Sequence, residues 1–139
     1  MTASILNPYI NFNGNAKEAM EFYKAALGGE LTTSTFKEGG GSVDAAEENQ
    51  IMHAMLITNN GMTLMASDTA KHFQYKPGTN ISISLSGENE AELKGYWEKL
   101  SQGGNITQPL VKAPWGDQFG MFTDKFGIQW LVNISAQKQ

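Results

Sequence analysis

The chain has 139 residues, of which 40% are apolar, with a formal net charge of −4 and no cysteine. This length supports one domain that removes roughly 68% of its unfolded surface from water, and no apolar run is long enough to span a bilayer. The missing cysteines exclude disulfides, thiol nucleophiles and cysteine-bound zinc.

All 10 basic residues are lysines, and they form no cluster along the sequence. Without arginine, the chain lacks the side chain that usually clamps carboxylates and phosphates, and a negative net charge does not suit a nucleic-acid backbone. The first residues contain neither the basic nor the apolar segment of a secretory signal. We therefore expect a cytoplasmic protein without nucleic-acid or membrane partners, whose mild negative field favours cationic ligands.

The first predicted elements are a strand over residues 5–13 and a helix after it. Asn15 is a good N-cap for this helix, and Glu18 stands where a side chain bonds back to the cap. The glycine pair Gly28 and Gly29 predicts the end of the helix.

The rest of the first half predicts three strands and a loop. A threonine-rich strand covers residues 30–36, and the glycine- and acid-rich residues 37–50 are typical of a loop. Strands over residues 51–58 and 62–67 form a hairpin, because the turn between them is the sequence Asn-Asn-Gly, whose residues tolerate positive φ.

The second half repeats this order after a connection over residues 68–78. A strictly alternating strand over residues 80–86 precedes a helix that begins at Asn89, with Glu92 in the reciprocal position. A second glycine pair, Gly103 and Gly104, ends this helix.

Two further features complete the second half. A short strand covers residues 105–111. Residues 115–133 supply an ordered loop and a closing hairpin, whose turn at residues 124–127 starts with Asp and ends with Gly. This stretch organises the chain, because the elements before it can be understood as its packing partners.

Each half therefore has the order βαβββ, which indicates an internal duplication within a single domain over residues 1–139. We expect an α+β fold with one module over about residues 5–68 and a second over about residues 79–134. Helices would lie outside a cupped mixed sheet, leaving the concave faces to form a shared cavity.

Three segments carry a resemblance to a known family: residues 8–30, 51–68 and 115–133, of which the last is the most specific. They resemble the PhnB-like branch of the vicinal oxygen chelate superfamily, which holds glyoxalase I, extradiol dioxygenases and the bleomycin- and fosfomycin-resistance proteins. The resemblance implies a glyoxalase-like fold and a homodimer. This branch is often labelled 3-demethylubiquinone-9 3-methyltransferase, although the sequence lacks the Gly-rich turn between a strand and a helix that common methyltransferases use.

The resemblance also implies where metal ligands would lie. The superfamily's metalloenzymes place a His or Glu on the first strand and on a hairpin strand of each module. In this sequence those positions fall on Pro8, Asn80, Trp130 and Met55, or on His53 if the first hairpin is shifted by two residues. Proline and tryptophan cannot bind a metal, so we expect neither a metal site nor another cofactor.

We expect polar and aromatic side chains from both modules to line the cavity. His53 is the candidate general acid or base, with Asp117 as its catalytic neighbour. The candidate ligand-binding residues are Met55, Asn80, Ser82, Trp115, Phe119 and Trp130. Aromatic walls with a few polar groups suit a small organic ligand with a planar or cationic part.

Several of these residues also have a structural interpretation. A single histidine on an apolar strand is more often structural than catalytic, and Trp130 and the hairpin methionines are equally consistent with a packed core. Asp117 follows a glycine and can simply close its loop.

Three classes of function remain open. The first is a metal-free protein of the bleomycin-resistance type that binds a small molecule. The second is a metal-dependent lyase, isomerase or dioxygenase of the glyoxalase type, which retained metal would indicate. The third is a dimeric interaction module whose cavity is filled by its own side chains, and which no small ligand would stabilise.

Overall fold

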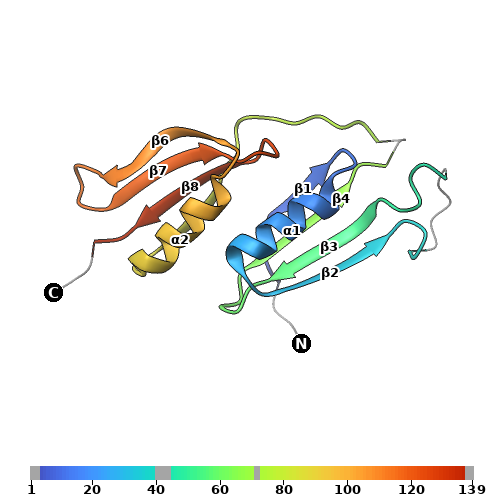
Figure 1. Ribbon diagram of the computed structural model, residues 1–139, viewed down its shortest axis with the longest axis horizontal. Coiled ribbons are helices and arrows are strands. Elements are labelled where there is room, and N and C mark those ends of the chain that lie inside the picture. The colour runs from blue at the N-terminus through green and yellow to red at the C-terminus, as the bar shows by residue number, and fades with distance from the viewer. Residues whose placement is uncertain (1–3, 40–44, 71–72, 137–139) are drawn as a thin grey trace. The chain divides into compact units, whose positions relative to one another are not determined.

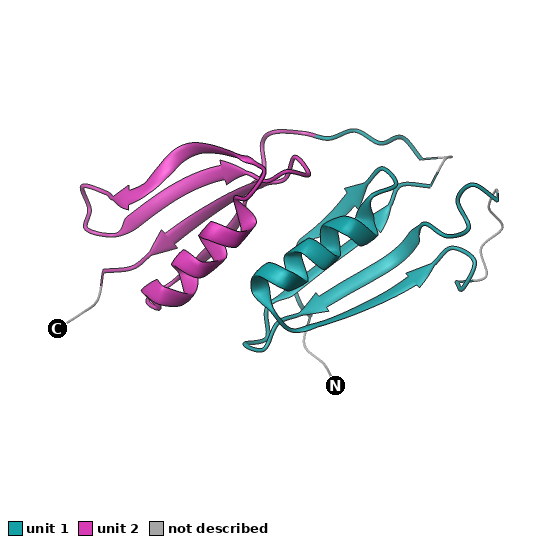
Figure 2. Cartoon of the chain, in the orientation of Figure 1, with its two compact units in different colours: residues 1–77 teal, residues 78–139 magenta. Residues whose placement is uncertain are grey.

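The computed structural model describes residues 4–39, 45–70 and 73–136, so residues 40–44 of the predicted loop lie outside the described residues. The chain divides into two compact units, residues 1–77 and residues 78–139 (Figure 2). Each unit contains one helix and one four-stranded sheet. Neither helix in the described part of the chain is long and apolar enough to cross a membrane.

Unit 1, residues 1–77, forms a mixed sheet with one helix against it (Figure 1). Its elements are β1 (Tyr9–Phe12), α1 (Ala16–Leu27), β2 (Glu30–Thr35), β3 (Ile51–Ile57) and β4 (Thr63–Asp68). The strands lie in the order β1-β4-β3-β2, in which β1 and β4 are parallel and the other pairs antiparallel. The helix buries its apolar side against the sheet, since Ala19, Met20 and Tyr23 have no exposed surface.

The predicted N-cap of α1 is wrong. The side chain of Asn15 makes no capping hydrogen bond. Instead Oδ1 of Asp68, at the end of β4, accepts the backbone N–H groups of Gly14 and Ala16 at 2.8 and 2.9 Å. A carboxylate at this place satisfies free donors of the first turn and interacts favourably with the helix dipole. The pattern of the local sequence could not reveal this cap, because Asp68 is 52 residues from Ala16.

Both predicted glycine pairs follow the end of a helix. The first glycine of each pair has a positive φ, 78° at Gly28 and 75° at Gly103, and so does Gly29, at 99°; other residues rarely adopt this conformation. A Cβ on the second would lie 2.2 Å from a backbone oxygen, that of Ile57 for Gly29 and that of Thr123 for Gly104. The pair therefore turns the chain and lets it pass close to the sheet.

Unit 2, residues 78–139, repeats this architecture. Its elements are β5 (Ile83–Gly87), α2 (Glu90–Leu100), β6 (Asn105–Lys112), β7 (Gln118–Thr123) and β8 (Gln129–Ile134). The strand order is β5-β8-β7-β6, and β5 is parallel to β8. Here the predicted N-cap is confirmed, because Asn89 Oδ1 accepts the backbone N–H of Glu92 at 3.1 Å.

The core of unit 2 is a stack of aromatic rings between α2 and its sheet. The ring of Trp97 meets Phe122 edge-on at a centroid distance of 5.0 Å, and Phe122 and Trp130 are parallel at 6.4 Å. Gly120 makes room for this stack, since a Cβ there would lie 2.6 Å from the Trp97 ring. Aromatic pairs in these orientations contribute beyond the area they bury.

The order βαβββ of both units confirms the predicted α+β class. Two edge strands, β1 and β5, are shorter than predicted: β1 begins at Tyr9 and β5 at Ile83, so Pro8 and Asn80 lie outside the strands. A cavity shared by the two units stays a prediction.

Candidate functional site

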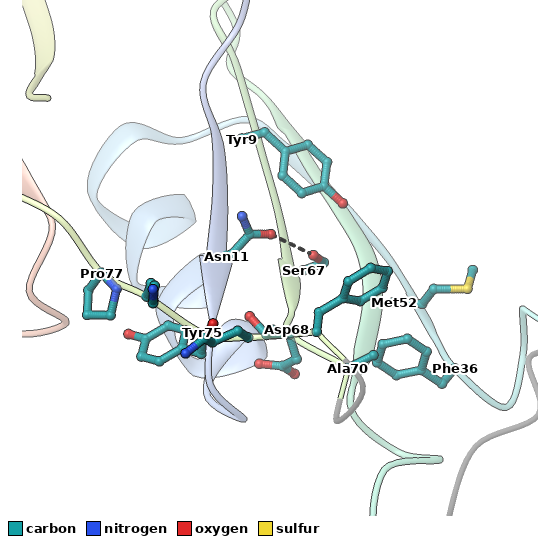
Figure 3. A pocket seen from close by; sticks show the side chains of 13 residues that line it. Tyr9, Asn11, Phe36, Met52, Ser67, Asp68, Ala70, Tyr75 and Pro77 are labelled. Atoms are coloured by element: carbon teal, nitrogen blue, oxygen red, sulfur yellow. Dashed lines mark hydrogen bonds between the residues drawn. The ribbon is translucent and has the colours of Figure 1, made fainter.

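A pocket of about 530 Å³ lies within unit 1, where β1 and β4 end (Figure 3). This volume is in the range of small-molecule sites, roughly 300–1,000 Å³. The residues that line it are Tyr9, Asn11, Phe36, Met52, Ser67, Asp68, Thr69, Ala70, Phe73, Gln74, Tyr75, Lys76 and Pro77. Aromatic side chains therefore meet a few polar groups, as in most ligand pockets.

The polar base of the pocket comes from the parallel pair of β1 and β4. Asn11 and Ser67 are direct partners in this pair. The hydroxyl of Ser67 donates a hydrogen bond of 3.4 Å to Oδ1 of Asn11, drawn as a dashed line in Figure 3. Phe12 and Ala66, the next residue and the preceding one on these strands, are buried in the core. Because side chains alternate along a strand, Asn11 and Ser67 lie on the sheet face opposite α1.

Asp68 also lines the pocket, but its carboxylate is already engaged. It is 3% exposed. Besides the two N–H groups at the start of α1, it accepts the backbone N–H of Ile51 on Oδ2 at 2.9 Å. These three bonds explain how a charged group is tolerated in the core, and they leave it little capacity to act on a ligand.

The segment after β4 supplies an aromatic wall. It is anchored by two backbone hydrogen bonds, from Thr69 N–H to the carbonyl of Phe12 at 2.7 Å and from Phe73 N–H to that of Ala70 at 2.9 Å. Phe73 and Tyr75 follow and are 65% and 39% exposed. The sequence predicts only a connection between the modules for this segment. Two aromatic residues before a Pro-Gly pair were the signal that could have identified it as part of a site.

Two of the predicted site residues, His53 and Met55, lie on β3 beside this pocket without lining it. Met55 is the direct partner of Met65. Each methionine is next to a buried alanine on its own strand, so the two methionines lie on the opposite face of the sheet from these alanines. The His53 ring is 6.1 Å from the ring of Tyr9, centroid to centroid. His53 therefore flanks the pocket through Tyr9, while its catalytic role stays a prediction.

The other predicted site residues belong to unit 2. Asn80 and Ser82 precede β5, and the exposed ring of Trp115 meets Phe119 of β7 at a centroid distance of 6.1 Å. Their convergence with the residues of β3 stays a prediction.

Trp130 is placed differently from its predicted ligand-binding position. It is 1% exposed, and its indole N–H donates to Oδ2 of Asp124 at 2.8 Å. Because it stacks on Phe122 against α2, it faces the core of unit 2. This agrees with the alternative interpretation of Trp130 as part of a packed core. The Trp130 side chain therefore lies on the opposite face of its strand from the expected one. A register shift of one residue produces this difference, since neighbouring residues of a strand point to opposite sides.

Asp117 links the loop before β7 to the end of β8 and the residues after it through hydrogen bonds to its carboxylate. Its pKa is held below the usual range, first by the backbone N–H of Ala136, which donates to Oδ1 at 2.9 Å. The Asn133 amide, which donates to Oδ2 at 3.0 Å, and the Trp115 side chain lower this pKa further. Because the folded-state pKa is depressed, this tie contributes above the unfolded pKa and is lost as pH falls through the folded value. Asp117 closes its loop in this way, and a catalytic role stays a prediction.

In the described part of unit 1, His53 of β3 is the imidazole that lies near the face opposite α1, beside Tyr9, and whether the chain binds a metal stays a prediction. On the face opposite α1, the side chains of β1 and β4 that lie together are those of Tyr9, Asn11, Met65 and Ser67. None of these is an imidazole or a carboxylate, the groups that bind divalent transition metals. Among the described residues, no three His, Asp or Glu side chains come together in a way that could hold a metal ion.

Comparison with known proteins identifies the family. The family model described as 3-demethylubiquinone-9 3-methyltransferase matches residues 4–133. The structure of protein PA1353 from Pseudomonas aeruginosa is 36% identical, with a TM-score of 0.83 and coverage of 97% of this chain and 100% of that one. Protein YjdN of Escherichia coli (strain K12) is 28% identical over 96% of this chain and 97% of its own length.

Two further comparisons concern the fold and its branch. A putative 3-demethylubiquinone-9 3-methyltransferase, PhnB protein, from Bacillus cereus is 27% identical, with a TM-score of 0.75 and coverage of 95% and 100%. Solved members of the glyoxalase/bleomycin resistance/dioxygenase superfamily share the fold at 16% and 18% identity, with TM-scores of 0.67 and 0.59. The predicted resemblance is confirmed, and the chain belongs to the 3-demethylubiquinone-9 3-methyltransferase family, a PhnB-like branch with the glyoxalase-type fold.

Proposed function

We propose that this protein binds a small organic molecule in the pocket of unit 1. The observation that carries the proposal is the pocket itself, about 530 Å³ in volume and lined by four aromatic rings and a small set of polar groups. Binding sites for small molecules combine these features, with apolar walls that supply affinity and a few polar atoms that orient the ligand.

The family description alone does not support methyl transfer by this chain. Methyltransferases of the common class bind their cofactor at a Gly-rich turn between a strand and a helix of a parallel sheet. In unit 1 the corresponding junction between β1 and α1 contains one glycine, Gly14. Its N–H and that of Ala16 already donate to the protein's own Asp68. Two of the donors that would face an anionic group at this helix are therefore engaged.

The test is a screen of small organic molecules against the intact chain, followed by two matched variants. Tyr75→Ala removes an exposed ring from the pocket, and Trp115→Ala removes an exposed ring from unit 2. Because an aromatic contact contributes about 0.5–1.5 kcal/mol, Tyr75→Ala should weaken binding roughly 2- to 10-fold, measured by calorimetry. Trp115→Ala should leave the affinity unchanged.

Two results would contradict the proposal. Loss of affinity in Trp115→Ala but not in Tyr75→Ala would move the site to unit 2, where the sequence placed Trp115 and Phe119. Absence of any ligand-induced stabilisation would favour the interaction module instead. Thermal melts with nickel, zinc, manganese and iron(II) belong to the same experiment, since a large selective shift lost in His53→Ala would favour the metal-dependent alternative.

A further inference from the structure

The unit 1 pocket offers uncommitted hydrogen-bond donors in the Asn11 amide, the Thr69 hydroxyl and the Lys76 ammonium group, and these donors restrict the chemistry of its ligand. We infer that the pocket accepts planar aromatic acids, with the ring against the aromatic wall and the carboxylate toward the ends of β1 and β4. The inference rests on the proposed function and narrows it to one class of compound.

The first donor is the side-chain amide of Asn11. The amide oxygen already accepts a hydrogen bond, because the hydroxyl of Ser67 donates to Oδ1. With the amide assigned in this orientation, its NH₂ group is the end left for a ligand, and no other side-chain hydrogen bond of Asn11 is formed within the described residues. Two N–H bonds at the base of the pocket favour an acceptor such as a carboxylate oxygen.

The second donor is the hydroxyl of Thr69. Its Oγ1 is buried and has no hydrogen-bond partner in the part of the chain that the structure describes. The residue is held in place at the end of the strand pair by its backbone bond to Phe12. Buried hydroxyl groups nearly always have a partner, so a rotation of the Thr69 side chain toward the pocket would let an oxygen atom of a bound molecule supply the one that the protein does not.

The charge available to a ligand is positive. Asp68 is the acid that lines the pocket, and its two oxygens already accept three backbone N–H groups. Lys76 also lines the pocket and is exposed. The negative net charge of the whole chain repels an anionic ligand beside this lysine only weakly, because salt screens charges beyond about 8 Å at physiological ionic strength. The charged groups within the pocket therefore decide whether an anionic or a cationic ligand is favoured.

The ring part of the inference follows from the wall. Tyr9, Phe73 and Tyr75 line the pocket while 47%, 65% and 39% exposed, so each has ring surface that a ligand could cover. Planar rings stack on such surfaces or meet them edge-on. The volume of about 530 Å³ is sufficient for a compound of two fused rings.

The experiment uses the intact chain and three probes that differ in one property each. These are 2-naphthoate, the cation 2-naphthylmethylammonium, and decahydro-2-naphthoate, which keeps the acid and the two fused rings without their aromaticity. We expect 2-naphthoate to bind at least about 10-fold more tightly than either of the others by calorimetry, because it alone satisfies both the donors and the wall. Its addition should shift the amide resonances of Asn11 and Thr69.

Two variants test the named donors. Asn11→Asp replaces the side-chain amide by a carboxylate of the same shape, so that an acceptor oxygen stands in place of the NH₂ group, and should reverse the preference between 2-naphthoate and the cation. Asn105→Asp makes the same change of charge on the exposed strand β6 and should leave the preference unchanged. Thr69→Val removes the hydroxyl at nearly constant volume and should weaken 2-naphthoate about 10-fold. Amide spectra confirm that each variant is folded.

The outcomes separate this inference from the proposed function. If the cation binds as tightly as 2-naphthoate, or if Asn11→Asp and Asn105→Asp alter the preference alike, the assignment to aromatic acids is overturned and the pocket remains. If none of the three probes binds but a compound that is not an aromatic acid occupies the pocket, the assignment is overturned in the same way. If no small molecule binds unit 1 at all, the proposed function fails with it.

Discussion

Two buried aspartates, Asp68 in unit 1 and Asp124 in unit 2, accept hydrogen bonds from N–H groups of the protein itself. Each is 3% exposed. Oδ1 of Asp124 accepts the N–H groups of Phe126 and Ile128 at 2.8 and 3.0 Å, and Oδ2 accepts the indole N–H of Trp130. Asp68 likewise accepts three N–H groups at the start of α1 and of β3. Each carboxylate thus fixes one junction of its unit.

Replacement of Asp124 by Asn should lower the free energy of unfolding by about 3 kcal/mol. The amide keeps the size of the side chain but offers one acceptor oxygen, so at least one buried N–H group loses its partner, and hydrogen bonds to a charged group contribute about 1.5–3 kcal/mol. Urea denaturation followed by tryptophan fluorescence measures the change.

A suitable control is Glu98→Gln, which makes the same chemical change on an exposed position of α2. It should alter the free energy of unfolding by less than about 0.5 kcal/mol. A loss below about 1 kcal/mol in Asp124→Asn would mean that the turn between β7 and β8 does not depend on this carboxylate.

At the scale of elements, two glycines of unit 2 differ in the space around them. A Cβ at Gly104 would lie 2.2 Å from the backbone oxygen of Thr123, whereas a Cβ at Gly95, inside α2, would have no heavy atom within 4 Å. Gly104→Ala should therefore destabilise the protein by about 1–3 kcal/mol, because the backbone has to move. Gly95→Ala should stabilise it by about 0.5–1 kcal/mol, because alanine loses less entropy in a helix.

Chemical denaturation of both variants measures these opposite signs in one unit. If Gly104→Ala were as stable as the parent protein, the close passage of β6 beside the end of β7 would not constrain the fold. If Gly95→Ala were destabilising, the helix would meet a neighbour that the described contacts do not include.

The elements themselves could be predicted from the sequence because their signals are local. Helical spacing, alternation and glycine pairs lie within a few residues of each other, and Asn89 caps α2 as predicted. Asn15 does not cap α1, because a carboxylate far along the chain takes its place. Which face of a strand is buried was equally non-local: Trp130 points to α2, although alternation alone allowed either side.

The candidate site was harder to predict for the same reason. Alternation along a strand is a local rule that would place Tyr9 and Asn11 on one face. Their partners Ser67 and Tyr75 come from the second hairpin strand and from a segment without regular structure. Only the parallel pairing of β1 with β4 brings these parts together, and no local pattern encodes it.

At the scale of the whole molecule, the two units have separate sheets and separate cores, and the proposed site lies in one of them. A ligand that binds only the folded form stabilises it by about 2.7 kcal/mol at a concentration of 100 times its Kd. This stabilisation should appear first in unit 1. Amide hydrogen exchange resolves it residue by residue, because the central strands exchange through the largest opening reactions.

We therefore expect saturating ligand to slow exchange at Ala54 and Leu56 of β3 and at Ala66 of β4 by roughly 100-fold. The reference amides are those of Phe122 and Val132, in the central strands of unit 2. If they slow as much as unit 1, the two units unfold together, and binding energy from one pocket stabilises the entire chain. If they are unchanged, unit 1 opens independently. If unit 2 is protected and unit 1 is not, the ligand is held by unit 2, and the pocket at the ends of β1 and β4 is not the binding site.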